Sequence, residues 1–284
     1  MWITSSGVSL HAAFVRRLAG IPNSEGVWVM EKVTSKDGTE IAYDTYGSGP
    51  VLVLVAGGFT DRARYVPDAE ALASTFTVVN YDRRGRGASG DAPTYAVERE
   101  WEDLDAVRSA TGARFACAYS SGSMVLFQAG LPFEKQAVME PPFRVDGAPP
   151  APERYIERLQ EYVAAGNPGG AAELFMVEAV GQPKEVVDQI RETPMWAGLE
   201  AIAHTLVYDG LQMGDSAVPT ELLSTIELPT LALYSNDSPA WLQAAVKQTA
   251  AALPNGTAEG HDGTFHTLPP ETLARVLTDY FVTA

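Results

Sequence analysis

Hydrophobic and polar residues alternate along two short segments near the start of the chain, at 27–33 and 40–46. Such alternation is typical of a β-strand with one buried face, because successive side chains of a strand point to opposite faces. The segments flank the sequence K-D-G-T at 36–39, and an Asp-Gly pair between two strands favours a tight turn. We therefore expect a β-hairpin.

Uninterrupted hydrophobic runs follow the hairpin. V-L-V-L-V-A at 51–56 and F-T-V-V-N-Y at 76–81 have the composition of strands that are covered on both faces, as in a parallel sheet. The pattern around and after them predicts helices at 62–74, 96–111 and 121–129, and strands at 114–118 and 135–139. This alternation of strands and helices indicates β-α-β units and a parallel sheet.

The alternation stops after residue 139 and returns near residue 230. The intervening segment reads as helices without a clear strand, expected at 153–163, 171–180, 185–191 and 196–208. Beyond it we expect strands at 230–234 and 256–260, a helix at 240–253 and a closing helix at 271–281. The sequence therefore predicts an α/β core, residues 30–143 and 227–284, interrupted by a helical insertion at 144–226.

Residues 1–29 precede this core as an N-terminal extension of uncertain status. The extension has no basic residue before its apolar part, which distinguishes it from a secretory signal. It could form a short amphipathic arm, and an arm that packs on a neighbouring chain would produce a homodimer. Met30 is also a sensible start for the domain by itself.

Composition narrows the class of partner. The formal net charge of −16 would repel a polyanion, so we expect no nucleic-acid partner. No stretch of about 20 apolar residues exists, so no membrane span is expected. The single cysteine, Cys117, lies in an apolar run and allows no intrachain disulfide, which fits a reducing cytoplasm.

The octet C-A-Y-S-S-G-S-M at 117–124 lies where an expected strand meets an expected helix. A turn this sharp requires small residues two positions before and two positions after its central residue. Ala118 and Gly122 meet that requirement for Ser120, whose hydroxyl would then stand at the carboxyl end of the sheet, where ligands bind. Ser120 is the candidate nucleophile. The alternative is that it only caps the helix.

A serine nucleophile also requires donors for the oxyanion that it creates. The N–H of Ser121 would lie at a helix N-terminus, which favours negative charge. The sequence A-G-G-F-T at 56–60 follows the first buried strand, and its glycines allow close approach of a ligand to the backbone. The N–H of Phe59 is therefore the second candidate donor, although Gly-Gly also suits a plain tight turn.

The base must be a histidine, and the chain has four, at positions 11, 204, 261 and 266. His261 and His266 both follow the last expected strand, from which a histidine can reach a serine that follows a middle strand. We favour His266, which lies nearer the final helix.

The imidazole requires a carboxylate that orients it and stabilises its charged form. Asp237 follows the strand at 230–234, and its loop can reach the histidine loop. Glu140 follows the strand at 135–139 and is the alternative acid. Asp237 before Ser-Pro also reads as an ordinary turn residue.

Together these segments resemble the α/β-hydrolase fold superfamily, over residues 30–284. The order Ser120, Asp237, His266 matches the family's order of nucleophile, acid and base. G-G-F at 57–59 is similar to the family's H-G-F oxyanion turn, and Y-D-R-R-G-R-G-A-S at 81–89 to its D-x-R-G-x-G-x-S loop. The resemblance implies an eight-stranded, mostly parallel α/β-hydrolase sheet flanked by helices, with a helical cap inserted after the strand at 135–139.

The sequence departs from the family pattern at two places. Ala118-Tyr119 stands where the family often has Gly-His, which alters the motif but keeps the small residue that the turn requires. M-E-P-P-F at 139–143 resembles members whose acid follows the preceding strand, so Glu140 remains open as the acid.

The resemblance implies a serine hydrolase of the carboxylesterase or lactonase type, without metal or organic cofactor, that cleaves an ester, lactone or thioester of a small, largely apolar molecule. The alternatives are a cofactor-free lyase, cyclase or perhydrolase on the same fold, or a non-catalytic binder. Aromatic, methionine and histidine side chains of the helical insertion are candidate substrate-binding residues: Phe175, Met176, Trp196, His204 and Tyr208.

Overall fold

The computed structural model describes residues 30–282, so the expected N-terminal extension at 1–29 lies outside the described residues. Within them, eight strands form one sheet in the order β1-β2-β4-β3-β5-β6-β7-β8. Their bounds are β1 Met30–Thr34, β2 Glu40–Tyr46, β3 Val51–Val55, β4 Thr77–Tyr81, β5 Phe115–Tyr119, β6 Lys135–Met139, β7 Thr230–Ser235 and β8 Gly256–His261. β1 and β2 pair antiparallel, as do β2 and β4, and all other pairs are parallel. The expected hairpin and the mostly parallel sheet are confirmed.

Helices cover both faces of the sheet. They are η1 Arg62–Tyr65, α2 Val66–Leu72, α3 Val97–Thr111, α4 Gly122–Ala129, α11 Ala240–Ala252 and α12 Pro270–Val282. The side chains of β3 alternate between two buried hydrophobic clusters: Val53 and Val55 belong to the first, Leu52 and Leu54 to the second. The first cluster includes residues of α3, α4 and α11, and the second includes residues of α2 and α12. Burial on both faces explains the uninterrupted hydrophobic runs.

The chain between β6 and β7 is helical, as expected. It forms α5 Tyr155–Ala164, α6 Pro168–Leu174, the π-helix η2 Phe175–Ala179, α7 Lys184–Arg191, α8 Met195–Ile202, α9 Thr205–Met213 and α10 Thr220–Leu223. The helix expected at 196–208 is thus two helices, α8 and α9, and the one expected at 171–180 ends as a π-helix. The exact domain boundaries, at 143/144 and 226/227, stay a prediction.

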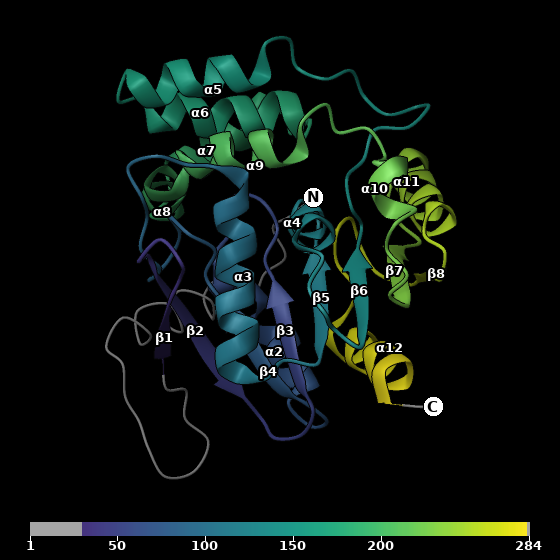
Figure 1. Cartoon of the computed structure of the whole chain (residues 1–284). Helices are drawn as coiled ribbons and strands as arrows, with labels where there is room; N and C mark the ends of the chain where they lie inside the picture. Colours follow the sequence, from purple (N-terminus) through teal and green to yellow (C-terminus); the bar gives the residue numbers. More distant parts are fainter. Residues whose placement is uncertain (1–29, 283–284) are drawn as a thin grey trace.

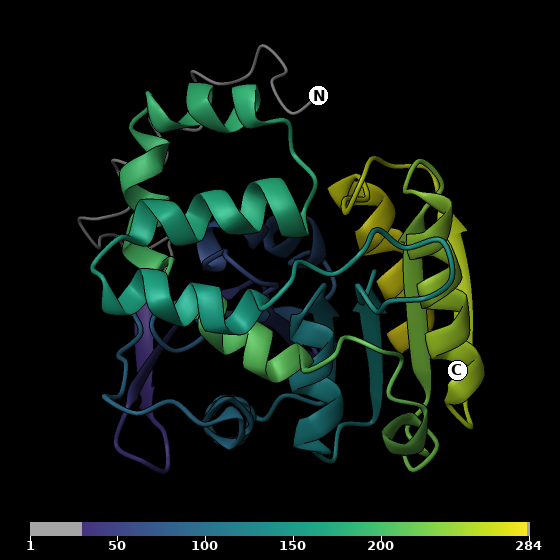
Figure 2. The same ribbon diagram turned by 90° about the horizontal axis from the view of Figure 1, so that it is seen from above.

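Of the helical insertion predicted at 144–226, α5, α6 and α9 lie above the carboxyl ends of the strands (Figure 1). Viewed from that end, these helices cover the part of the sheet away from β7 and β8 (Figure 2). Leu223 of α10 instead packs in the first hydrophobic cluster of the core. A third hydrophobic cluster holds the insertion together, and it includes Phe59 of the loop after β3. No helix within residues 30–282 is long and apolar enough to cross a membrane.

Gly122 shows how closely the turn after β5 packs on the neighbouring strand. A Cβ atom at Gly122 would lie 2.5 Å from the carbonyl oxygen of Ala56 and 2.8 Å from that of Val55. Both obstacles are backbone atoms at the end of β3, so neither can move aside easily. The glycine at the +2 position after Ser120 is therefore required by contact between two strands' ends, as the small-residue pattern predicts.

We expect Gly122→Ala to lower the free energy of unfolding by about 1–3 kcal/mol, because the added methyl group overpacks the backbone. Gly198→Ala is the control: Gly198 lies inside α8, and its Cβ would meet no atom within 4 Å. Greater helix propensity should stabilise this variant by up to about 1 kcal/mol. Urea denaturation measures the free energy of unfolding of both variants. If that of Gly122→Ala equals the wild-type value, the contact argument is wrong.

Candidate active site

Ser120 lies at the turn between β5 and α4, half-buried at the carboxyl end of the sheet. Its backbone is in the left-handed region, with φ of 51°, and its N–H donates to the carbonyl of Met139 at 2.8 Å. Left-handed backbone costs a residue with a side chain about 1–3 kcal/mol and persists where the surroundings enforce it. Ser120 lines a cavity of about 960 Å³, to which residues of the core and the insertion both contribute.

His266 also lines this cavity, in the loop between β8 and α12. Its Nδ1 lies 2.8 Å from Oε2 of Glu140, and its backbone N–H donates to the same oxygen at 3.1 Å. The other oxygen of Glu140 accepts the N–H of Ser235 at 2.7 Å. Glu140 is completely buried, so these donors replace water around its carboxylate. The contact at Nδ1 leaves Nε2 of His266 as the ring nitrogen available to the cavity.

The preferred acid, Asp237, does not contact His266. It lies exposed in the turn after β7, where its backbone N–H donates to Oγ of Ser235 at 3.2 Å. The structure instead places the alternative, Glu140, beside the imidazole. The two carboxylates follow adjacent parallel strands, and only the one that immediately follows its strand points inward. His261, the other histidine of this region, lies 3.2 Å from Glu259 rather than beside a buried acid.

Backbone strain concentrates around the cavity. Within residues 30–282, six residues other than glycine have positive φ. Four belong to the candidate site and two more line the cavity: Phe59, Ser120, Glu140 and His266, then Arg154 and Ser216. Such backbone clusters at functional sites, where precise placement of a side chain outweighs its conformational cost.

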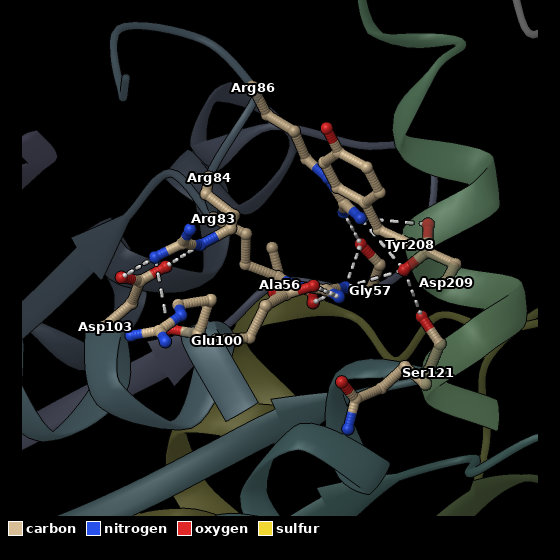
Figure 3. A network of polar contacts seen from close by, with 12 residues as sticks. Ala56, Gly57, Arg83, Arg84, Arg86, Glu100, Asp103, Ser121, Tyr208 and Asp209 are labelled. Carbon is tan, nitrogen blue, oxygen red and sulfur yellow. Dashed lines mark hydrogen bonds and ion pairs between the residues drawn. The ribbon is translucent and has the colours of Figure 1, made fainter. Parts of the chain in front are cut away.

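The two residues that carry the expected oxyanion donors, Phe59 and Ser121, both contact one carboxylate, that of Asp209 in α9. The Phe59 N–H donates to Oδ2 of Asp209 at 3.2 Å. The Ser121 hydroxyl donates to Oδ1 at 3.2 Å (Figure 3). Ser121 lines the cavity and its backbone N–H lies before the first turn of α4. The Phe59 N–H is therefore already paired, which its sequence position did not predict.

Two buried arginines hold Asp209 in place. Nη2 of Arg86 lies 2.9 Å from each oxygen of Asp209, and Nη1 of Arg83 lies 2.9 Å from Oδ1. Arg83 also donates to Glu100 in α3, from Nη2 to Oε1 at 2.7 Å. Burial by itself would raise the pKa of Asp209, but the guanidinium groups of Arg86 and Arg83 outweigh it and hold this pKa below its ordinary value.

Of the five expected substrate-binding residues, only Phe175 lines the cavity. Met176 and Trp196 pack in the hydrophobic cluster of the insertion. His204 and Tyr208 turn away toward Asp91, with their Nε2 and hydroxyl 3.1 and 2.9 Å from its Oδ2. Helical spacing predicted that these residues share faces of helices, but not which face meets the substrate space.

Tyr119, which stands at the family's usual histidine position, is buried against Tyr65. The ring centroids lie 4.3 Å apart, and the Tyr65 hydroxyl accepts the N–H of Gly57 at 2.9 Å. The pair thus packs against the loop after β3 and holds it through the hydrogen bond from Gly57 to Tyr65. Tyr65 and Tyr119 also line the cavity, together with Asp68.

Asp68 is a buried carboxyl group in α2 that sequence reasoning did not select. Burial raises its pKa from 3.8 to about 6, a rise that the Arg64 guanidinium only partly offsets. A carboxyl group that must lose its proton inside the protein is a cost to stability at neutral pH.

Residues 30–282 contain no group of three or more His, Cys, Asp or Glu side chains arranged to hold a metal ion.

Comparisons with known proteins agree with this architecture. The model of the family described as "Alpha/beta hydrolase family" matches residues 52–276. An alpha/beta hydrolase from Sphaerobacter thermophilus is 45% identical, with a TM-score of 0.83, over 89% of this chain and all of that chain. A curated relative, the uncharacterized hydrolase YraK of Bacillus subtilis, is 36% identical over 89 residues, which are 30% of this chain and 33% of that protein.

More distant solved structures share the fold. A thermophilic esterase from Thermogutta terrifontis, described with malate bound, is 23% identical with a TM-score of 0.68, over 89% of this chain and 97% of that chain. The enol-lactonase from Burkholderia xenovorans LB400 is 20% identical with a TM-score of 0.66, over 88% of this chain and 99% of that chain. At these identities the likeness shows the fold alone.

We expect Asp68→Asn to stabilise the protein above about pH 6. Between about pH 4 and 6 the folded wild type binds more protons than the unfolded chain, so its stability falls as the pH rises through this window. The asparagine never ionises, and the raised pKa corresponds to at most about 3 kcal/mol. Denaturation at pH 4, 6 and 8 should show a gain at pH 8 that vanishes at pH 4. The exposed Asp146→Asn is the control, and an equal gain at all three pH values would refute the assignment.

Proposed function

We propose that this chain, which belongs to the alpha/beta hydrolase family, is a serine hydrolase that cleaves an ester, lactone or thioester of a small, largely apolar molecule. The observation that carries the proposal is the 2.8 Å contact between Nδ1 of His266 and buried Glu140, in a loop that lines the same cavity as Ser120. A buried acid on one imidazole nitrogen fixes the tautomer that leaves the other nitrogen as a base.

In the proposed reaction, the hydroxyl oxygen of Ser120 attacks the carbonyl carbon of the substrate while His266 takes the hydroxyl proton. The same proton then passes to the leaving alcohol or thiol, and an acyl group remains on Ser120. Water, deprotonated by His266, releases the acid and restores the serine. Glu140 orients the imidazole and stabilises the imidazolium.

The Ser121 and Phe59 N–H groups are the proposed oxyanion donors. Ser121 N–H lies at the start of α4, where the helix dipole favours negative charge. The Phe59 N–H would divide its bond between the oxyanion and Asp209. Loss of one such donor commonly lowers the rate by about 10²–10³-fold.

The apolar character of the proposed substrate follows from the cavity walls. Large apolar side chains of both the core and the insertion line the cavity: Phe175, Met213, Trp241, Phe265 and Leu273. A volume of about 960 Å³ is at the upper end for small-molecule sites, so it accommodates a substrate larger than a simple short ester.

A fluorophosphonate probe separates the hydrolase from the lyase, cyclase and binder alternatives. We expect the wild type to be labelled once, at Ser120, and Ser120→Ala to lose both the label and at least about 10³-fold of its ester hydrolysis. Ser123→Ala, which alters a buried serine in the first turn of α4, should be labelled as the wild type is. A well-folded wild type that neither labels nor hydrolyses any of a panel of esters, lactones and thioesters would refute the proposal.

The two candidate acids can be compared directly. We expect Glu140→Gln to lower kcat by about 10²–10⁴-fold, because the amide cannot stabilise the imidazolium and presents an N–H₂ group to donors. Asp237→Asn should stay within about twofold of the wild type, because that side chain is exposed and does not contact His266. Thermal denaturation confirms that both variants are folded. The reverse result would restore Asp237 as the acid.

A further inference from the structure

Asp209 is the point at which the helical insertion enters the active site. It belongs to α9, yet its carboxylate accepts five hydrogen bonds from the core. Four come from the Arg83 and Arg86 guanidinium groups and the Ser121 hydroxyl (Figure 3), and the fifth comes from the Phe59 N–H. The side chain is buried and lines the cavity. The serine-hydrolase reaction as proposed above does not use this group.

The Asp209 contacts hold both elements that carry the oxyanion donors. One oxygen accepts from Phe59, in the loop after β3, and the other accepts from Ser121, beside the nucleophile. A Cβ atom at Gly58 would lie 2.9 Å from Oδ2 of Asp209 and 3.0 Å from Oγ of Ser121, so the loop, the turn and the carboxylate meet without spare room.

The arginines hold the same loop from its carbonyl side. Nη1 of Arg86 donates to the Gly57 carbonyl at 2.7 Å, and Nη1 of Arg83 lies 3.3 Å from the Ala56 carbonyl. The formal charges of the cluster cancel, because the two arginines face two carboxylates, Asp209 and Glu100. The negative charge of Asp209 is thus compensated locally, and a developing oxyanion nearby does not face an unbalanced anion.

We infer that Asp209 is a positioning residue for the proposed serine hydrolase, which sets the Phe59 and Ser121 donors at the separation and direction that the oxyanion of the transition state requires. The inference rests on the proposed function. It assigns the insertion a part in the chemical step, in addition to any contact with substrate. A carboxylate needed only to neutralise Arg83 and Arg86 would not have to contact the two donor residues as well.

The test replaces Asp209 by alanine and returns the carboxylate as formate. In Asp209→Ala the Arg83, Arg86, Phe59 and Ser121 donors remain around a space the size of the lost carboxylate, which suits a small anion. We expect kcat for a p-nitrophenyl ester to fall about 100-fold with KM changed less than about threefold. Sodium formate should restore kcat at least about tenfold, whereas formamide and sodium chloride of equal ionic strength should not.

Thermal denaturation accompanies each rate measurement and separates positioning from folding. If formate raises the melting temperature but leaves kcat unchanged, Asp209 is only structural and the inference is wrong. A variant that is faster than the wild type and is slowed by formate would show that the carboxylate obstructs the donors. A wild type without ester turnover would refute the proposed function, whereas an active wild type with an unrescued variant refutes the inference alone.

A milder pair of variants covers the case in which Asp209→Ala does not fold. Ser121→Ala removes one bond from Asp209 to the turn but keeps the backbone donor and the ion pairs, so kcat should fall about 3- to 10-fold. Ser123→Ala is the matched control, because Ser123 is also buried and its hydroxyl has no hydrogen-bond partner among residues 30–282. Equal rates for the two variants would overturn the inference.

Discussion

The turn that the chain makes directly after a buried parallel strand is the constraint on which this site depends. It occurs twice, after β5 at Ser120 and after β6 at Glu140, and both residues have left-handed backbone. β5 and β6 are neighbouring strands, with Tyr119 opposite Met139. The two turns therefore lie side by side at the carboxyl end of the sheet. Ser120 and Glu140 are therefore fixed by rigid elements rather than by mobile loops. Only His266 comes from a longer loop, and two hydrogen-bonding groups of that residue contact Glu140.

A second constraint is the burial of three arginine side chains in the loop after β4. Arg83, Arg84 and Arg86 are essentially removed from water, so each must find carboxylates or carbonyl groups inside the protein. Arg84 contacts Asp103 and Asp37, whereas Arg83 and Arg86 converge on Asp209 of the insertion. The chain has 36 acidic residues, and several of them serve here as partners for buried cations. Removal of one partner would leave a buried, unpaired charge, which commonly costs about 3–5 kcal/mol.

The sequence predicted what depends on local pattern. Periodicity located the strands and most of the helices, the small residues around Ser120 indicated the sharp turn, and nearness to the final helix favoured His266 over His261. The sequence favoured Asp237 over Glu140, whereas the structure places Glu140 beside His266. Both carboxylates follow neighbouring parallel strands, and their distance to the histidine depends on how two loops fold. The structure pairs Glu140 with the histidine because its carboxylate is buried under that loop, whereas the turn at Asp237 leads into solvent.

Residues of the insertion were the hardest to predict, for a physical reason. Helical spacing shows that a helix has an apolar face, but the docking of that face on the core decides what it meets. Tyr208 and Asp209 are neighbours in α9, yet Tyr208 turns outward to Asp91 and Asp209 turns inward to the arginines. An aspartate inside a helix carries no local signal of a partner that is 123 residues away in sequence.

Phe59, in the loop after β3, is attached to the insertion through both its side chain and its backbone. Its side chain belongs to the hydrophobic cluster of the insertion, and the centroid of its ring lies 5.3 Å from that of Phe175. Its backbone N–H donates to Asp209. Both attachments come from the insertion, so a displacement of the insertion would move the side chain and the N–H of Phe59 together. Phe175 lines the cavity, and under the proposed function an apolar substrate that packs against it would press on Phe59, the residue that carries one of the proposed oxyanion donors. Binding energy from a part of the substrate remote from the scissile bond could then be used to align that donor, which is the route by which such contacts raise kcat rather than lower KM alone.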